Sequence, residues 1–84
     1  MVSNFRQINK VLVAGRGEIA VRIFRTLAEM GIGSVAIHAR DDEDALHVAV
    51  ADESLLLRGE GLKETYLNIE QIVDLAIQCG ADAI

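Results

Sequence analysis

Short apolar runs and longer helical repeats alternate along the chain. Residues 10–14 form a β-branched apolar run that is typical of a buried parallel strand. Residues 34–38 and 54–57 predict two more short strands, and residues 81–84 predict the beginning of a fourth. The segment before the first strand, residues 1–9, is expected to be a frayed leader.

A helix is predicted over residues 17–30, because apolar and charged residues recur there at helical spacing on separate faces. Gly31 is expected to end this helix in a left-handed conformation. The apolar stripe consists of Ala20, Ile23, Phe24 and Leu27. The charged stripe, whose spacing allows two i,i+4 ion pairs, consists of Glu18, Arg22, Arg25 and Glu29.

A second long helix has clear start signals. Asn68 can cap it, and Gln71 stands three residues later, as in a capping box. Leu67 and Ile72 have the spacing of a hydrophobic staple. Gly80 is expected to close the helix. The predicted apolar stripe consists of Ile69, Ile72, Val73 and Ala76.

A shorter helix is expected over residues 45–50, with Ala45, Leu46 and Ala49 facing inward. The order strand, helix, strand, short helix, strand, helix, strand predicts an α/β fold: a Rossmann-like, doubly wound parallel sheet of about four strands with helices on both faces. Ligands of such sheets bind outside the carboxyl ends of the strands. Because the last strand stops short, we expect part of any active cleft to be missing.

Charge and composition exclude several classes of protein. A net charge of −5 and a pI of about 4.8 argue against binding to nucleic acid, which requires a basic surface. No run approaches the roughly 20 apolar residues of a membrane span, and residues 1–7 lack the apolar core of a secretion signal. The single cysteine, Cys79, fits a reducing compartment, so a cytoplasmic protein is expected. Cys79 itself is expected to be a small buried helix residue.

The first predicted turn matches a dinucleotide-binding pattern. Gly15, Gly17 and Ala20 follow the G-x-G-x-x-G/A spacing between a strand and a helix. Arg40, just beyond the second strand, could favour a 2′-phosphate and therefore NADP. A tight turn that packs the helix on the sheet without a nucleotide is the alternative. An independent NAD(P)-binding module thus stays open as a second hypothesis.

Other polar residues provide no specific chemistry. His38 and His47 have no cysteine or glutamate at metal-ligand spacing, and His47 is expected to be a partly exposed helix residue. Acidic residues 41–44 suit a helix N-terminus; a metal site is the alternative, although they lack the glycine and spaced ligands of a calcium loop. Asp52 and Glu53 are expected to be solvated. No residue is therefore assigned a catalytic or metal-binding role.

Five blocks of the chain resemble the opening of biotin carboxylase, in that family's order and spacing. They read RGEIAVRI, DALHV, ADE, YLNI and GADAI, at residues 16–23, 44–48, 51–53, 66–69 and 80–84. The blocks cover nearly the whole chain from Lys10 and are far more specific than the glycine pattern. The resemblance is to the Rossmann-like N-terminal domain that precedes the family's ATP-grasp body.

The resemblance implies a parent enzyme that is an ATP-dependent ligase of the acyl-CoA or pyruvate carboxylase type. Such an enzyme activates bicarbonate with MgATP and carboxylates biotin on a carrier domain. The 84 residues are expected to be an incomplete domain that is inactive alone and binds no cofactor itself. Its implied partners are the ATP-grasp body, the biotin carrier domain, the carboxyltransferase and a second copy in a homodimer.

Two further expectations concern single residues. The resemblance places Arg25 and Glu29 where the family's helix contributes to a dimer contact in bacterial enzymes; a solvated stripe is the alternative. Arg22 belongs to the same stripe, through which the chain could also act as a non-catalytic interaction module. Gly15 stands where the family usually has asparagine, which removes a side chain able to bond the backbone or a neighbouring domain.

Overall fold

The computed structural model describes residues 7–84, so most of the expected leader lies outside the described residues. Three parallel strands form a sheet in the order β1-β2-β3, with register pairs such as Leu12 with Val35 and Ile37 with Leu55. The strands are β1 (Lys10–Val13), β2 (Gly33–His38) and β3 (Glu53–Leu56). All three predicted strands are thereby confirmed to within one residue at each end.

The predicted fourth strand begins beside β1, on the side away from β2. Ala83 forms a parallel bridge with Val11, and the amide of Leu12 donates to the Ala83 carbonyl at 3.0 Å. The order across the sheet is therefore fourth strand, β1, β2, β3, with all strands parallel. β2 and β3 are added successively on one side of β1, and the fourth strand is added on its other side. Such a reversal in the order of addition characterises doubly wound sheets.

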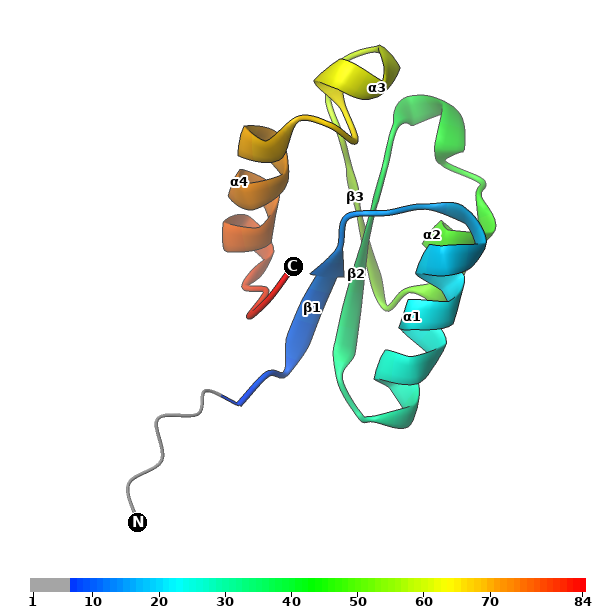
Figure 1. Ribbon diagram of the computed structural model, residues 1–84, viewed down its shortest axis with the longest axis vertical. Coiled ribbons are helices and arrows are strands. Elements are labelled where there is room, and N and C mark those ends of the chain that lie inside the picture. The colour runs from blue at the N-terminus through cyan, green and yellow to red at the C-terminus, as the bar shows by residue number, and fades with distance from the viewer. Residues whose placement is uncertain (1–6) are drawn as a thin grey trace.

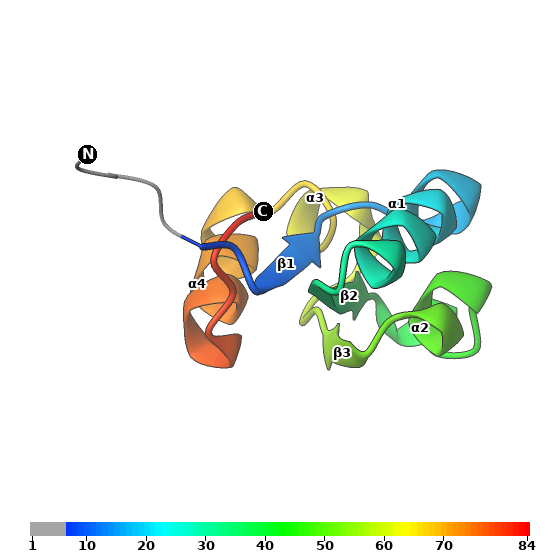
Figure 2. The same cartoon turned by 90° about the horizontal axis from the view of Figure 1, so that it is seen from below.

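Helices cover both faces of the sheet, as predicted (Figures 1 and 2). α1 and α2 lie on one face, and α4 lies on the other. A short helix, α3, lies between β3 and α4. The helices are α1 (Gly17–Glu29), the 3-10 turn η1 (Arg40–Asp42), α2 (Leu46–Val50), α3 (Gly61–Glu64) and α4 (Ile69–Cys79).

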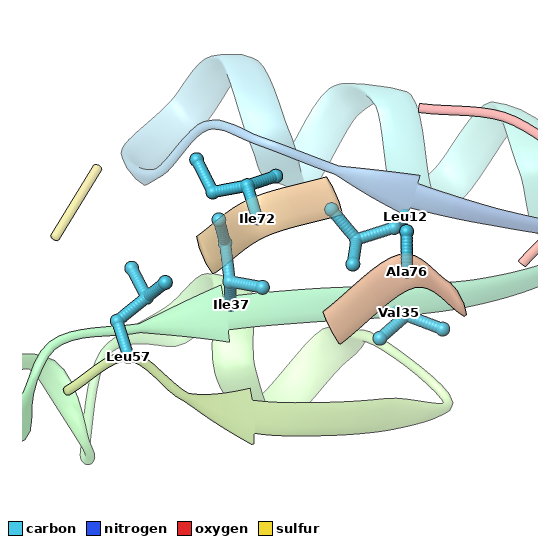
Figure 3. Close-up of a cluster of buried hydrophobic side chains, with 6 residues drawn as sticks. All are labelled: Leu12, Val35, Ile37, Leu57, Ile72 and Ala76. Carbon is cyan, nitrogen blue, oxygen red and sulfur yellow. The ribbon is translucent and has the colours of Figure 1, made fainter. Parts of the chain in front are cut away.

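Two apolar clusters hold the three layers together. Alternate residues of each strand point to opposite faces, so each face of the sheet contributes to one cluster. Figure 3 shows the cluster between the sheet and α4, formed by Leu12, Val35, Ile37, Leu57, Ile72 and Ala76. The cluster on the face of α1 is formed by Val13, Ala20, Phe24, Leu27 and Ala36.

The buried face of α1 differs from the predicted stripe at one position. Ile23 is 39% exposed, whereas Val21 is buried. α1 packs against α2 as well as against β2, and this second neighbour widens the buried face on one side only. Of the two predicted ion pairs, Glu18 and Arg22 come within 3.3 Å, but Arg25 and Glu29 form no salt bridge among the residues described.

α4 is also rotated relative to the prediction. Ile69 and Val73 are 75% and 40% exposed, so they do not belong to the core. Gln71 is hydrogen-bonded to the backbone of Arg58 at the end of β3, at 2.6 and 3.0 Å, which turns the helix toward that strand. The residues of α4 that pack into the core are Ile72, Leu75, Ala76 and Cys79.

The buried face of α2 differs from the prediction. Leu46 is 62% exposed and Ala49 is exposed, while His47 is buried. The Nε2 atom of His47 lies 3.1 Å from the carbonyl oxygen of Ile37, so Nε2 carries the proton and donates. The expectation of a partly exposed His47 was wrong, because the hydrogen bond to β2 stabilises the ring in its buried position.

The ends of the long helices follow the predicted signals. The side chain of Asn68 accepts from the Gln71 amide at 3.1 Å, which confirms the cap of α4. Leu67, however, stays 67% exposed, which leaves little contact for the expected staple. Gly31, two residues after the end of α1, and Gly80, directly after α4, adopt left-handed φ angles of 73° and 75°.

Candidate functional site at the carboxyl edge of the sheet

Three loops meet at the edge where the parallel strands end, and a cluster of three side chains joins them. Arg16 follows β1, Asp42 lies in the turn after β2, and Tyr66 lies between α3 and α4. We call these residues the carboxyl-edge cluster. They occupy the region in which doubly wound sheets bind ligands, so they are the first candidate for a functional site.

Asp42 is the centre of the carboxyl-edge cluster. Its Oδ2 atom accepts from the Tyr66 hydroxyl at 2.6 Å and from Arg16 Nη1 at 3.0 Å. The Tyr66 oxygen in turn accepts from the amide of Ala39 at 3.0 Å, and the Arg16 guanidinium lies 4.9 Å from the centre of the Tyr66 ring. The Asp42 carboxylate thus connects the loop after β1, the turn after β2 and the segment between α3 and α4.

These contacts set the protonation states. The hydrogen bond from Tyr66, with a further contribution from Arg16, lowers the pKa of the Asp42 carboxyl. Burial, and then the hydrogen bond to Asp42, raises the pKa of the Tyr66 phenol. At neutral pH the carboxylate is charged and the phenol is neutral. A carboxylate held by two donors is a weak base, so the arrangement acts as a structural clamp.

Two shallow hollows flank the carboxyl-edge cluster. One, of about 240 Å³, is lined by Arg16 and Tyr66 together with Gly61 and Leu62. The other, of about 280 Å³, has Arg40 on the loop after β2 and the Gly59–Gly61 segment after β3 as its walls. The loop after β1 does not contribute to this second hollow.

Gly15 and Gly17 do not line this hollow with Arg40. Gly17 opens α1 with a φ of +71°, a conformation that favours glycine, and so fits the tight-turn interpretation. Gly15 has an ordinary φ, and a Cβ there would meet nothing within 4 Å. The Cβ atom of an asparagine would therefore fit at Gly15, so crowding at that atom does not impose the departure from the family pattern.

The acidic segment does not assemble a metal site. Asp41 and Asp42 lie in η1, and α2 begins only at Leu46, so the acids precede α2 by several residues. Within residues 7–84, no three histidine, cysteine or acidic side chains are grouped to hold a metal ion. The His38 ring is hydrogen-bonded to its neighbour in sequence: Nδ1 lies 3.0 Å from the Ala39 carbonyl oxygen.

The pair Asp52 and Glu53 is not merely solvated, contrary to expectation. Asp52 Oδ2 accepts from the Ser34 amide at 2.9 Å, and its own amide donates to Ser34 Oγ at 3.0 Å. Glu53 Oε2 lies 2.7 Å from Lys10 Nζ, across the amino edge of the sheet. Asp52 therefore ties the start of β3 to β2, and Glu53 ties it to β1, the strand beyond β2.

Four of the remaining predicted residues belong to helices. Cys79 is half-buried, and its thiol donates to the Ala76 carbonyl at 3.5 Å, in line with the expected helix position. Arg22 is largely exposed on the outer face of α1, as are Arg25 and Glu29.

Across the described residues, no helix is long and apolar enough to cross a membrane.

Comparison with known proteins gives one consistent family. The family model described as "Biotin carboxylase, N-terminal domain" matches residues 7–84. The pyruvate carboxylase of Staphylococcus aureus is 54% identical over 80 residues, which are 94% of this chain and 7% of that protein. Biotin carboxylase 1 of Bacillus subtilis is 49% identical over 77 residues, which are 92% of this chain and 17% of that protein.

A solved structure agrees in detail. The biotin carboxylase domain of a thermophilic 2-oxoglutarate carboxylase, bound to ADP, is 50% identical and superposes with a TM-score of 0.88 over 93% of this chain and 17% of that one. The chain spans less than a fifth of the length of each of these relatives. The comparisons give no support to the alternative of an NAD(P)-binding module. The chain belongs to the biotin carboxylase N-terminal domain family.

Proposed function

We propose that the chain is the N-terminal structural domain of an ATP-dependent biotin carboxylase. In such an enzyme MgATP activates bicarbonate, and biotin on a carrier is carboxylated. The match over residues 7–84, together with 50% identity and a TM-score of 0.88 to a biotin carboxylase domain, carries this proposal. ATP, Mg and biotin are cofactors of the whole ligase, and the enzyme acts in the cytoplasm.

The role of this domain is architectural. In the carboxyl-edge cluster, Arg16 and Tyr66 both donate hydrogen bonds to Asp42, so the three side chains are directed toward one another. We infer that the catalytic groups are supplied by an ATP-grasp body, and that a carrier domain and a carboxyltransferase complete the reaction. Residues 1–84 then form one wall of the active cleft and have no carboxylase activity alone.

A chimera tests this function directly. The matched segment of Bacillus subtilis biotin carboxylase 1 is replaced by this chain, and ADP release that depends on biotin and bicarbonate is measured. We expect the chimera to retain activity, while the isolated chain and a version with the matched segment deleted have none. A folded but inactive chimera, or specific turnover by the isolated chain, would refute the assignment.

We further propose that the outer face of α1 contributes to contact between two subunits. Arg22, Arg25 and Glu29 form an exposed charged stripe, and only Arg22 has an ion-pair partner within its own helix. Two free, opposite charges one turn apart suit a reciprocal contact across a twofold axis. This surface would join copies of the enzyme without entering the reaction.

Sedimentation of the chimera tests the contact. Arg25→Glu is expected to shift a dimer toward monomer, and adding Glu29→Arg to restore part of the dimer. Lys63→Glu, the same charge reversal on the exposed helix α3, is the control and should leave the dimer intact. Equal sedimentation of all four proteins would remove α1 from the interface.

A further inference from the structure

β3 is the outermost strand of the sheet on the side away from β1 (Figure 2). Within residues 7–84 it pairs with β2 alone, so its other edge has no neighbouring strand. The amide of Leu57, directly after β3, donates to the His38 carbonyl of β2 at 2.8 Å. Because the backbone groups of alternate strand residues point to opposite sides, those of Ser54 and Leu56 point to the open edge.

Arg58 shows that this edge accepts a partner that resembles a strand. Its amide donates to Gln71 Oε1 at 2.6 Å, and its carbonyl accepts from Gln71 Nε2 at 3.0 Å. One carboxamide of α4 thus binds both backbone groups of Arg58, as a further strand would. Among the residues described, Ser54 and Leu56 form no hydrogen bond outside the sheet itself. Their outward amides and carbonyls are therefore open to an incoming chain.

A trough runs between this edge and α4. A hollow of about 210 Å³ is bordered by Leu56 of β3 and by Asp74, Leu75 and Gln78 of α4. A second hollow, of about 450 Å³, shares three of its lining residues with the first and extends toward the start of α4. A chain added to β3 would therefore have α4 as a wall along one of its sides.

Charge decides which side chains suit the α4 side of an added chain. Glu64, Glu70 and Asp74 line the larger hollow, against a single cation, Arg58. Glu70 and Asp74 form no salt bridge among the residues described. The aliphatic stem of a lysine or arginine can lie along Leu75 while its charge reaches Asp74. Basic side chains are therefore favoured on this side.

The other side of an added chain meets an aliphatic surface. Leu55 and Leu57 pack into the cluster under α4, so the side chain of Leu56 points to the opposite face of the sheet, on which α1 and α2 lie. Leu56 is 48% exposed there. An aliphatic neighbour on the added chain would cover Leu56, as cross-strand pairs do.

We propose that the outer edge of β3 binds an extended segment of a partner protein in which basic and aliphatic residues alternate. The backbone of the segment pairs with Ser54 and Leu56, its basic side chains face Asp74, and its aliphatic side chains cover Leu56. A second copy of β3 does not fit this description, because residues 53–56 contain no basic residue. The inference does not depend on the proposed function, since it uses only β3 and α4.

Binding of a model peptide tests the proposal. A short fluorescent peptide of alternating lysine and valine is titrated with the 84-residue chain, and binding is followed by fluorescence anisotropy. A peptide of the same composition, with its lysines and valines in two separate blocks, is the control. We expect the alternating peptide to bind about tenfold or more tightly than the control, because only alternation places each kind of side chain on its own face.

Two variants separate the contribution of strand pairing from that of charge. Leu56→Pro removes an amide that points away from β2, at an edge position where a strand tolerates proline. Asp74→Lys reverses the charge beside the hollow. Each is expected to weaken binding about tenfold or more. Glu43→Lys makes the same charge reversal at an exposed position before α2 and should leave binding unchanged.

Hydrogen exchange of the unaltered chain provides a measurement that needs no variant. The alternating peptide should slow exchange of the Leu56 amide about tenfold or more, because that amide gains an acceptor. Exchange of the Leu12 amide, which donates to Ala83 at the other side of the sheet, should not change. The same experiment is carried out with the chimera, with and without the peptide.

Four outcomes would overturn the proposal. The alternating peptide fails to bind or leaves exchange at Leu56 unchanged, or Leu56→Pro binds it as tightly as the unaltered chain does. Protection of Leu56 that is lost on dilution without peptide would assign the edge to a second copy. Protection in the chimera without peptide would assign it to the enzyme's own polypeptide. Biotin-dependent ADP release by the chimera is measured separately, so either hypothesis can fail while the other stands.

Discussion

Tyr66 shows how much of this domain depends on one side chain. It is the only tyrosine of the chain, its hydroxyl donates to Asp42 and accepts from the Ala39 amide, and its ring lies under Arg16. Loops that follow different strands are thereby joined at a single phenol. Because the phenol is partly buried beside a carboxylate, its ionisation reports directly on the carboxyl-edge cluster.

Titration of Tyr66 provides a first prediction. Ionising the phenol would place a second negative charge beside Asp42 in a partly buried site, so its pKa lies above the ordinary value near 10. Asp42→Asn should lower this pKa, although burial should still keep it raised. Ultraviolet absorbance of the phenolate measures it without interference, because the chain has no tryptophan. Glu43→Gln is the control, and an equal shift there would contradict the assignment.

The turn between β1 and α1 contains two glycines with different requirements. Gly17 has a φ of +71°, whereas Gly15 has an ordinary φ and free space around it. Gly15→Ala is expected to be neutral or to raise the free energy of unfolding by about 0.4–1 kcal/mol, through the entropy of the unfolded chain. Gly17→Ala should lower it by about 1 kcal/mol or more. Urea unfolding compares them, and equal effects would disprove the distinction.

At the scale of elements, α1 and α4 begin in different ways. The residue before α1, Arg16, makes no capping hydrogen bond with its side chain, which instead reaches Asp42. α4 begins at Asn68, whose side chain accepts from the Gln71 amide. α4 contributes Ile72 and Ala76 to the cluster beneath it, so the stability of its first turn bears directly on that cluster.

Removal of the α4 cap is therefore expected to be costly. Asn68→Ala should lower the free energy of unfolding by about 1 kcal/mol, within a range of about 0.5–2 kcal/mol, because the Gln71 amide loses its acceptor. Asn68→Asp keeps an acceptor at the positive end of the helix and should lose less. Urea unfolding provides the measurement. Equal losses in the two variants would mean that the cap does not set the stability of α4.

The whole molecule is held at its amino edge by contacts between distant parts of the chain. Lys10 Nζ lies 2.7 Å from Glu53 Oε2 and donates to the Cys79 carbonyl at 3.0 Å, which connects β1, β3 and the end of α4. Asp82 Oδ2 accepts from the amides of Asn9 and Lys10 at 2.8 and 3.1 Å. These contacts attach the start of the fourth strand to β1.

Hydrogen exchange can test the attachment of the fourth strand. The amide of Leu12 donates to Ala83, so its protection depends on that strand staying in place. Asp82→Ala should speed exchange at Leu12 about tenfold or more, and change Val35, in the centre of the sheet, much less. Asp74→Ala removes the same charge from an exposed position of α4 and should change neither. Unaltered exchange at Leu12 would show that Asp82 is dispensable.

The prediction succeeded where local signals are sufficient. The strands were recognised because each contains a short apolar run, and Asn68 and Gly80 were recognised because capping depends on a few neighbouring residues. Errors arose in the rotation of each helix about its own axis, which decides which residues are buried. Ile23, Ile69 and Val73 were expected in the core but are exposed. Each amphipathic pattern admits several rotations, and packing against α2 or β3 selects one of them.

The candidate site was the least predictable part. Arg16 and Asp42 are 26 residues apart, and Asp42 and Tyr66 are 24 apart. No spacing rule connects a charged turn residue with a tyrosine ahead of a later helix. The only available signal was topological: loops after parallel strands meet at one edge, which identifies the region but not the residues.

The amino-acid sequence by itself determined the order of the elements, the ends of the long helices and the family, because these depend on neighbouring residues or on recurring blocks. Tertiary structure alone decided that His47 is buried, that Asp52 and Glu53 tie strands together, and that Asp42 clamps Arg16 and Tyr66. Such pairs are chosen by the packing of layers, since a hydrogen bond forms between whichever groups the fold brings within reach.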